Sequence, residues 1–380
     1  MGIDVQTTRQ VKSELALLGR PPTAVDVAEA LRRCGQVVSD GAVLTVQQSV
    51  WHDSVGAGPL DQLLSLPGVT DVLVNGPAEV YVDRGAGLEL TGLRFASDDD
   101  VRHLATRLAA SVGRRLDDGS PFVDARLASG VRVHAVLATV ASPGTCLSLR
   151  VPAARRLTLE DWVEQGGLDP GAAALLRRLI QAKVAFLVSG GTGSGKTTLL
   201  SALVDLVPAD QRIVVVEDSR ELNPDHGHVI RLESRPANAE GVGLITMTDL
   251  VRQALRMRPD RIVVGEVRGG ELCDLLRALN TGHEGGCATV HANSAEDVPA
   301  RLEALAALGG LDRAATHAQI AAALSIVIHV ARQGQRRLVR QIGLLRRQPS
   351  GLVETVPAWS MEQDRSKLWP GLDALERLLR

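Results

Sequence analysis

Residues 190–198 read Gly-Gly-Thr-Gly-Ser-Gly-Lys-Thr-Thr and match the phosphate-binding pattern G-x-x-x-x-G-K-[ST]. An apolar, β-branched run at 184–188 precedes the motif, and residues 199–206 follow it with the apolar spacing of a helix. Glycines let backbone N–H groups surround an anion, and a helix N-terminus adds partial positive charge. The sequence therefore predicts a nucleoside triphosphate site formed by Gly190, Gly191, Thr192, Gly193, Ser194, Gly195, Lys196, Thr197 and Thr198.

Two side chains of this loop are expected to carry its chemistry. Lys196 would reach the β- and γ-phosphates of ATP, and the hydroxyl of Thr197 would bind Mg²⁺. The chain has only four lysines against 38 arginines (42 − 4), so composition alone does not explain a lysine at this position.

Acidic residues follow two further strand-like runs. Glu217 and Asp218 come after the run 212–216, and Glu266 comes after the run 261–265. In doubly wound sheets the carboxyl ends of the strands meet at one edge, where ligands bind. We expect Glu266 to orient an attacking water. Gly265 stands where many such sites have an aspartate, so Glu217 is the candidate for the carboxylate on the Mg²⁺ side, with Asp218 as an open alternative.

Two histidines flank a glycine pair and another strand-like run. His283 lies before Gly285-Gly286, and His291 directly follows the run 287–290. We interpret them as sensors of the γ-phosphate, in which an imidazole changes partners when the phosphate leaves. The alternative is an ordinary pair of turn histidines.

Composition excludes several classes of protein. The net charge is −2 and aromatic residues make up 2% of the chain, so there is no general attraction to nucleic acid. The four cysteines form no C-x-x-C pair. No apolar run approaches the roughly 18–20 residues of a spanning helix, and residues 1–20 lack a signal-peptide layout. These features predict a cytoplasmic protein.

At 380 residues the chain is longer than a domain with one hydrophobic core usually is. The pattern of helix-like and strand-like segments also changes twice along it. We expect a helical lead-in at 1–55, a smaller α+β domain with a mainly antiparallel sheet at 56–151, a linker at 152–156, and an α/β domain with a mainly parallel sheet at 157–380. The expected strands lie at 71–75, 79–83, 88–95, 131–137, 146–151, 184–188, 212–216, 261–264, 287–290, 324–330 and 338–345, with helices at 97–112 and 373–380.

Taken together, these motifs resemble those of the type II/type IV secretion-system ATPases. The runs 190–198, 217–218, 258–269 and 281–293 look like the Walker A motif, the Asp box, an atypical Walker B motif and the His box of that family. The runs 70–77, 80–83, 119–126 and 130–132 resemble its CpaF branch, the tight-adherence (Tad/Flp) pilus assembly ATPases. The resemblance covers roughly residues 55–350, and four motifs in the same order make it specific.

The resemblance implies a RecA-like P-loop domain that hydrolyses ATP with Mg²⁺. It implies a homo-hexameric ring at the inner face of the cytoplasmic membrane, which powers pilus assembly or secretion with integral membrane platform proteins. Gly-Glu at 265–266 is usual in this family. Arg132 and Arg150 align with arginines that relatives bring to the γ-phosphate.

The alternative is a DNA-directed RecA-like motor, such as a helicase or a conjugation ATPase. Such a protein needs a basic channel with aromatic side chains that stack on bases. The whole chain holds three Phe, one Tyr and four Trp, which gives that alternative little support.

Overall fold

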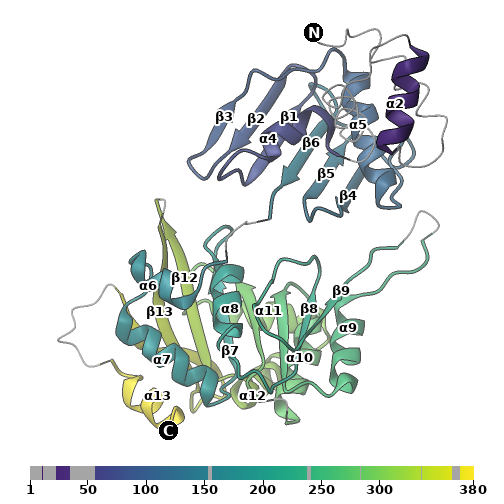
Figure 1. Cartoon of the computed structure of the whole chain (residues 1–380). Helices are drawn as coiled ribbons and strands as arrows, with labels where there is room; N and C mark the ends of the chain where they lie inside the picture. The colour runs from purple at the N-terminus through teal and green to yellow at the C-terminus, as the bar shows by residue number, and fades with distance from the viewer. Residues whose placement is uncertain are drawn as a thin grey trace. The chain divides into compact units, whose positions relative to one another are not determined.

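The computed structural model describes residues 11, 23–34, 56–152, 156–237, 241–282, 284–334, 336–361 and 369–380. It divides the chain into two compact units, Met1–Ala153 and Ala154–Arg380 (Figure 1). Most of the predicted lead-in at 1–55 and the middle of the predicted linker lie outside the described residues. Within the lead-in, the described helix α2 (Ala24–Arg33) begins with a capping box between Thr23 and Asp26.

The first unit is built on a six-stranded antiparallel sheet in the order β3-β2-β1-β6-β5-β4. Inward residues alternate with outward ones along the strands, as expected of a sheet with one solvated face. The strands are β1 (Asp71–Asn75), β2 (Glu79–Asp83), β3 (Leu88–Leu90), β4 (Phe122–Arg126), β5 (Arg132–Val136) and β6 (Cys146–Arg150).

Helix α5 (Asp98–Ser111) packs with the sheet to form this unit's hydrophobic core. Ser97 caps it, and three aspartates in its first turn complement the helix dipole. Its apolar stripe of Val101, Leu104 and Leu108 is buried in one cluster with the inward valines of the sheet. The short elements η1 (Gly58–Leu60) and α4 (Asp61–Leu64) precede β1.

The second unit contains an eight-stranded sheet in the order β14-β13-β12-β7-β11-β10-β8-β9. The run from β12 to β9 is parallel, and β13 and β14 add antiparallel strands at one edge. The strands are β7 (Phe186–Gly190), β8 (Ile213–Glu217), β9 (Val229–Glu233), β10 (Arg261–Val267), β11 (Cys287–His291), β12 (Ile326–Gln333), β13 (Arg336–Arg347) and β14 (Val353–Ser360).

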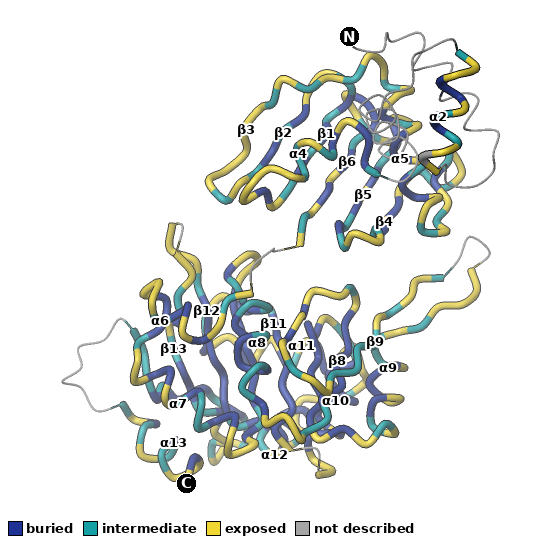
Figure 2. Tube along the Cα trace, in the orientation of Figure 1, coloured by how far each residue is buried: buried dark blue, intermediate teal, exposed yellow. Residues whose placement is uncertain are grey.

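Helices cover both faces of this sheet, so its central strands are buried throughout (Figure 2). One face packs on α6 (Leu159–Glu164), α7 (Pro170–Gln181), α8 (Lys196–Val204) and α13 (Leu372–Leu378). The other packs on α9 (Met247–Ala254), α10 (Glu271–Asn280), α11 (Val298–Leu308) and α12 (Arg313–Ala323). Successive strand residues therefore enter different cores, as Leu187 and Val188 do.

The sequence prediction missed three strands, β4, β9 and β14, and it made β3 too long. All four lie at sheet edges, where burial on one face weakens the apolar pattern. β14 also contains Pro357, a residue that argues against a central strand. None of the helices in the described part of the chain has the length and apolar character that a membrane crossing requires.

Candidate active site

The phosphate-binding motif occupies the turn between β7 and α8. β7 is fully buried and ends at Gly190, and α8 begins at Lys196. Gly195 has φ of 101°, a left-handed conformation that glycine adopts without strain. A Cβ at Gly190 would lie 2.2 Å from the carbonyl oxygen of Val330, so no side chain fits there. Strand, glycine loop and helix are thus joined as this motif requires.

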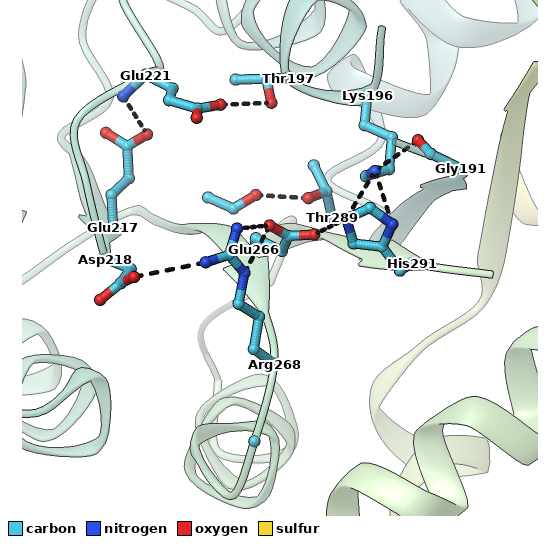
Figure 3. A network of polar contacts seen from close by, with 12 residues as sticks. Gly191, Lys196, Thr197, Glu217, Asp218, Glu221, Glu266, Arg268, Thr289 and His291 are labelled. Carbon is cyan, nitrogen blue, oxygen red and sulfur yellow. Dashed lines mark hydrogen bonds and ion pairs between the residues drawn. The ribbon is translucent and has the colours of Figure 1, made fainter. Parts of the chain in front are cut away.

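The ammonium of Lys196 is directed back across this loop. Its Nζ donates to the carbonyl oxygens of Gly190 and Gly191, at 3.1 and 3.0 Å, and lies 3.3 Å from Nε2 of His291 (Figure 3). Burial lowers the pKa of Lys196, and the nearby charge of Glu266 opposes that shift. The loop therefore holds a partly desolvated cation beside the N-terminus of α8.

The strands beside β7 bring the other candidates to the same edge. Next to β7 in the sheet come β11, then β10, then β8. β11 ends at His291, β10 ends one residue after Glu266, and β8 ends at Glu217. A β-bulge between Val264 and Val267 puts one extra residue into β10 opposite β11. Such a bulge re-aims the side chains beside it, here that of Glu266.

Glu266 lies between two basic side chains (Figure 3). Its Oε2 accepts from Nε and Nη2 of Arg268, at 2.8 and 2.5 Å, and its Oε1 lies 2.5 Å from Nε2 of His291. Arg268 also reaches Asp218 at 3.5 Å. Lys196, His291, Glu266, Arg268 and Asp218 therefore form one continuous chain of polar contacts.

His291 is the link between the lysine and the glutamate. Burial, followed by the charge of Lys196, lowers its pKa, although Glu266 acts in the opposite direction. Its ring touches both neighbours: Nε2 lies 2.5 Å from Oε1 of Glu266, and Nε2 and Nδ1 lie 3.3 and 3.5 Å from Nζ of Lys196. The imidazole therefore connects Lys196 to Glu266 through direct contacts.

Glu217 occupies the space left by Gly265. A Cβ at residue 265 would lie 2.7 Å from Cγ of Glu217, so an aspartate does not fit there while Glu217 keeps this position. Oε1 of Glu217 accepts from the backbone N–H groups of Glu221 and Leu222, at 2.9 and 2.8 Å. Burial is the main cause that raises the pKa of Glu217 to about 7.

The carboxylate that reaches Thr197 is that of Glu221. The Thr197 hydroxyl donates to Oε2 of Glu221 at 3.3 Å, and Glu217 holds the backbone of that segment. Sequence reasoning did not single out Glu221, Arg268 or Thr289, whose hydroxyl donates to the carbonyl of Gly265 at 2.6 Å. Arg268 lies inside the run 258–269, where the sequence pattern alone assigns it no role.

Three predicted site residues remain. His283 falls outside the described residues. Arg132 and Arg150 are in the first unit, directly opposite each other on β5 and β6. Each has a distant ion pair, with Asp124 and Asp71 respectively, at 3.7 Å.

The geometry around the loop fits a nucleotide and Mg²⁺. Among the described residues, no side chain caps the N-terminus of α8, and a Cβ at Gly191 or Gly193 would meet nothing within 4 Å. These features leave N–H groups and space for phosphate oxygens. The described residues contain no cluster of three or more acidic, His or Cys side chains able to hold a metal alone. Mg²⁺ commonly uses one or two carboxylates together with substrate phosphates, which Thr197 and Glu221 suit.

Comparison with known proteins decides the family. The family model described as type II/IV secretion system protein matches residues 53–366. The chain belongs to this family. A Mycobacterium tuberculosis relative named "Putative conjugal transfer protein Rv3659c" is 53% identical over 338 residues, which are 87% of this chain and 96% of the relative. Type IV secretion system protein VirB11 of Brucella suis is 35% identical over 63% of this chain and 73% of its own length.

Solved structures of family members share the fold. The Legionella pneumophila ATPase DotB matches with a TM-score of 0.55 at 18% identity, over 77% of this chain and 80% of its own. The pilus retraction motor PilT with bound ADP matches with a TM-score of 0.51 at 21% identity, over 76% and 78%. The family predicted from the motifs is therefore confirmed at the level of type II/IV secretion system proteins.

The buried Glu217 leads to a prediction about stability and pH. Folding raises the pKa of this carboxyl from 4.5 to about 7. Its contribution to stability is therefore fully present below pH about 4.5 and is lost as pH rises to about 7. The ionised form then costs the folded state about 3 kcal/mol, since each pKa unit is worth about 1.4 kcal/mol. Glu217→Gln keeps the acceptor oxygen and cannot ionise.

We expect Glu217→Gln to be more stable than wild type at pH 8, and the difference to shrink strongly by pH 5. Denaturant unfolding at both pH values measures it. The control is Asp210→Asn, which removes an exposed carboxylate from the same unit. An equal pH dependence in Glu217→Gln and wild type would show that this carboxyl does not titrate as described.

Proposed function

We propose that this chain is a Mg²⁺-dependent ATPase whose hydrolysis cycle powers pilus assembly or protein secretion. The observation that carries the proposal is the contact chain from Lys196 through His291 and Glu266 to Arg268, built at the mouth of a phosphate-binding loop. Family membership supports it, because VirB11 and DotB are named as a secretion protein and an ATPase.

Each group in this chain of contacts has a role in the proposed reaction. Lys196 and the N-terminus of α8 bind the β- and γ-phosphates of ATP, and Thr197 with Glu221 holds Mg²⁺, which neutralises phosphate charge. Glu266 accepts a hydrogen bond from the attacking water, and its two basic neighbours fix its orientation. His291 changes partners between Lys196 and Glu266 as the γ-phosphate leaves.

Two substitutions separate binding from chemistry. Lys196→Ala should abolish hydrolysis because it removes the cation directed at the phosphates. Glu266→Gln keeps the shape and should bind ATP while hydrolysing it at least about 100-fold more slowly, the scale of a lost general base. Steady-state hydrolysis and nucleotide titration measure the two effects. Near-normal turnover in Lys196→Ala would contradict the proposed ATP site. If Glu266→Gln turns over normally and Glu217→Gln does not, then Glu217, not Glu266, is the catalytic carboxylate.

We also propose that Arg132 and Arg150 stabilise charge on the γ-phosphate, in the same chain or in a neighbouring one. Their guanidinium groups share the solvated face of the first unit's sheet, because directly opposed residues of an antiparallel pair point the same way. Among the described residues, the ion pairs of these two arginines are long, at 3.7 Å each, and two adjacent like charges of this kind favour an anion.

Arginines supplied to a phosphoryl group are worth about 10³–10⁵ in rate. We therefore expect Arg132→Ala or Arg150→Ala to slow hydrolysis while nucleotide binding by the second unit persists. Hydrolysis rates at saturating ATP measure this effect. Arg84→Ala, which removes an exposed, ion-paired arginine of the same unit, is the control. If both variants hydrolyse ATP like Arg84→Ala, the first unit has no part in catalysis.

The motor itself we propose to be a homo-hexameric ring of the CpaF branch, which serves Tad/Flp pilus assembly. The motifs of the first unit support this branch. A second unit that cycles with ATP, joined to a separate first unit, converts nucleotide state into displacement. We place the ring in the cytoplasm, recruited to the inner membrane face by integral platform proteins.

A second candidate function is a DNA-directed motor of conjugation. Relatives named for conjugal transfer favour it, including TrbB of Rhizobium radiobacter, which is 31% identical over 77% of this chain and 88% of its own length. The net charge of −2 and the scarcity of aromatic residues count against it. Stimulation of ATP hydrolysis by single-stranded DNA would favour this alternative.

Recruitment by a platform protein has a cellular test. The chain's slightly negative net charge gives no broad attraction to anionic lipid. We expect the protein to sediment with membranes in cells that express the platform genes and to become free when these genes are deleted. Fractionation with quantitative blotting measures the distribution. Retention on membranes without the platform would mean that lipid, not protein, provides the anchor.

A further inference from the structure

Arg337, on β13, lies against the phosphate-binding loop, yet the reaction proposed above does not use it. Its Nη1 donates to the hydroxyl of Thr198 at 3.3 Å. A Cβ at Gly195 would lie 2.8 Å from Cδ of Arg337 and 3.3 Å from Cη2 of Trp162. The stem of Arg337 therefore passes over the loop immediately before Lys196, beside the buried ring of Trp162.

Backbone contacts on two sides fix the strand that carries Arg337. Arg337 is directly opposite Arg332 in the antiparallel ladder with β12, and the N–H of Val339 donates to the carbonyl of Gly167 at 2.8 Å. Sites placed on strands are more precise than those placed on mobile loops. The backbone that carries this exposed arginine is thus fixed beside the loop.

The charges around Arg337 call for an anion. Arg332 stands directly opposite, and like charges in that arrangement destabilise a sheet. Loss of hydration, followed by the charge of Arg332, lowers the pKa of Arg337. Within the part of the chain that the structure describes, the only hydrogen bond found for the Arg337 side chain goes to a neutral hydroxyl. Phosphate matches the fork of a guanidinium and satisfies this charge.

The strand order separates Arg337 from the candidate catalytic residues. Glu266, His291 and Glu217 lie on β10, β11 and β8, all on one side of β7. β12 and β13, with Arg337, lie on the other side of β7. Lys196 reaches toward His291, on the side of the catalytic groups, while Thr198 and Gly195 meet Arg337. Arg337 therefore lies away from the groups that would act on the γ-phosphate.

We propose that Arg337 is a nucleotide-binding residue that pairs with the α- or β-phosphate, on the side of the loop opposite Glu266. The proposal rests on nucleotide binding at this loop, as proposed above. Because both of these phosphates are present in ADP and in ATP, Arg337 contributes to the affinity for each nucleotide equally.

The test removes the charge of Arg337 and keeps an apolar side chain of similar length. Arg337→Met retains an apolar chain over Gly195 and beside Trp162, and Arg337→Lys restores a cation without the fork. We expect Arg337→Met to lower the affinity for ADP and for a non-hydrolysable ATP analogue by the same factor. That factor should be about 10-fold to 100-fold, the scale of a charge-assisted hydrogen bond. Arg337→Lys should recover part of the loss. Calorimetric titration of the full-length chain measures both ligands.

Arg336→Met is the matched control, because neighbouring residues of a strand point to opposite faces. It should leave both affinities unchanged, and none of the three variants should melt below the wild-type temperature without nucleotide. Wild-type affinity in Arg337→Met overturns the inference while leaving the proposed function intact. A loss confined to the ATP analogue would instead place Arg337 at the γ-phosphate and also overturn it. A wild-type chain that binds neither ligand would refute the proposed function itself.

Discussion

Backbone pairing at Gly190 is the constraint on which the rest of the site depends. This residue pairs with His291 of β11 on one side and with Val330 of β12 on the other. The approach is so close that a single methyl group at residue 190 would collide with the carbonyl of Val330. A buried hydrogen bond between Ser189 and His329, 3.0 Å long, ties the same two strands one residue earlier. The loop, the histidine and the arginine-bearing hairpin thus share one register.

The two glutamates show how burial assigns different tasks to the same side chain. Glu217 is enclosed, accepts from backbone N–H groups and has a raised pKa, so its main effect is on the shape of the segment that follows. Glu266 lies between basic groups near the loop and keeps its carboxylate oriented toward the site. A glycine at 265 makes this division possible, because it gives Glu217 the volume that an aspartate would fill.

The sequence was most informative where local pattern and burial agree. The central strands of the second unit, such as β7 and β8, appear as continuous apolar runs because both faces are covered. The phosphate-binding loop between β7 and α8 is recognisable from its glycine spacing together with these flanking runs. Edge strands such as β9 are half-exposed and carried no comparable signal. Glu221 could not be found from the sequence, because it meets Thr197, 24 residues away in the chain, only through a turn whose backbone the carboxylate of Glu217 holds. Arg337 escaped for the same reason, since 139 residues separate it from Thr198.

The ring of Trp162 gives this molecule an optical property of its own. The side chain is 2% exposed and its far edge meets the loop at Gly195, in a chain with four tryptophans and one tyrosine. Ultraviolet emission from the protein therefore comes almost entirely from indole, and one of the four emitters adjoins the phosphate loop. Because indole emission depends on the surroundings of the ring, we expect the unlabelled chain to change its fluorescence when the loop beside Trp162 changes.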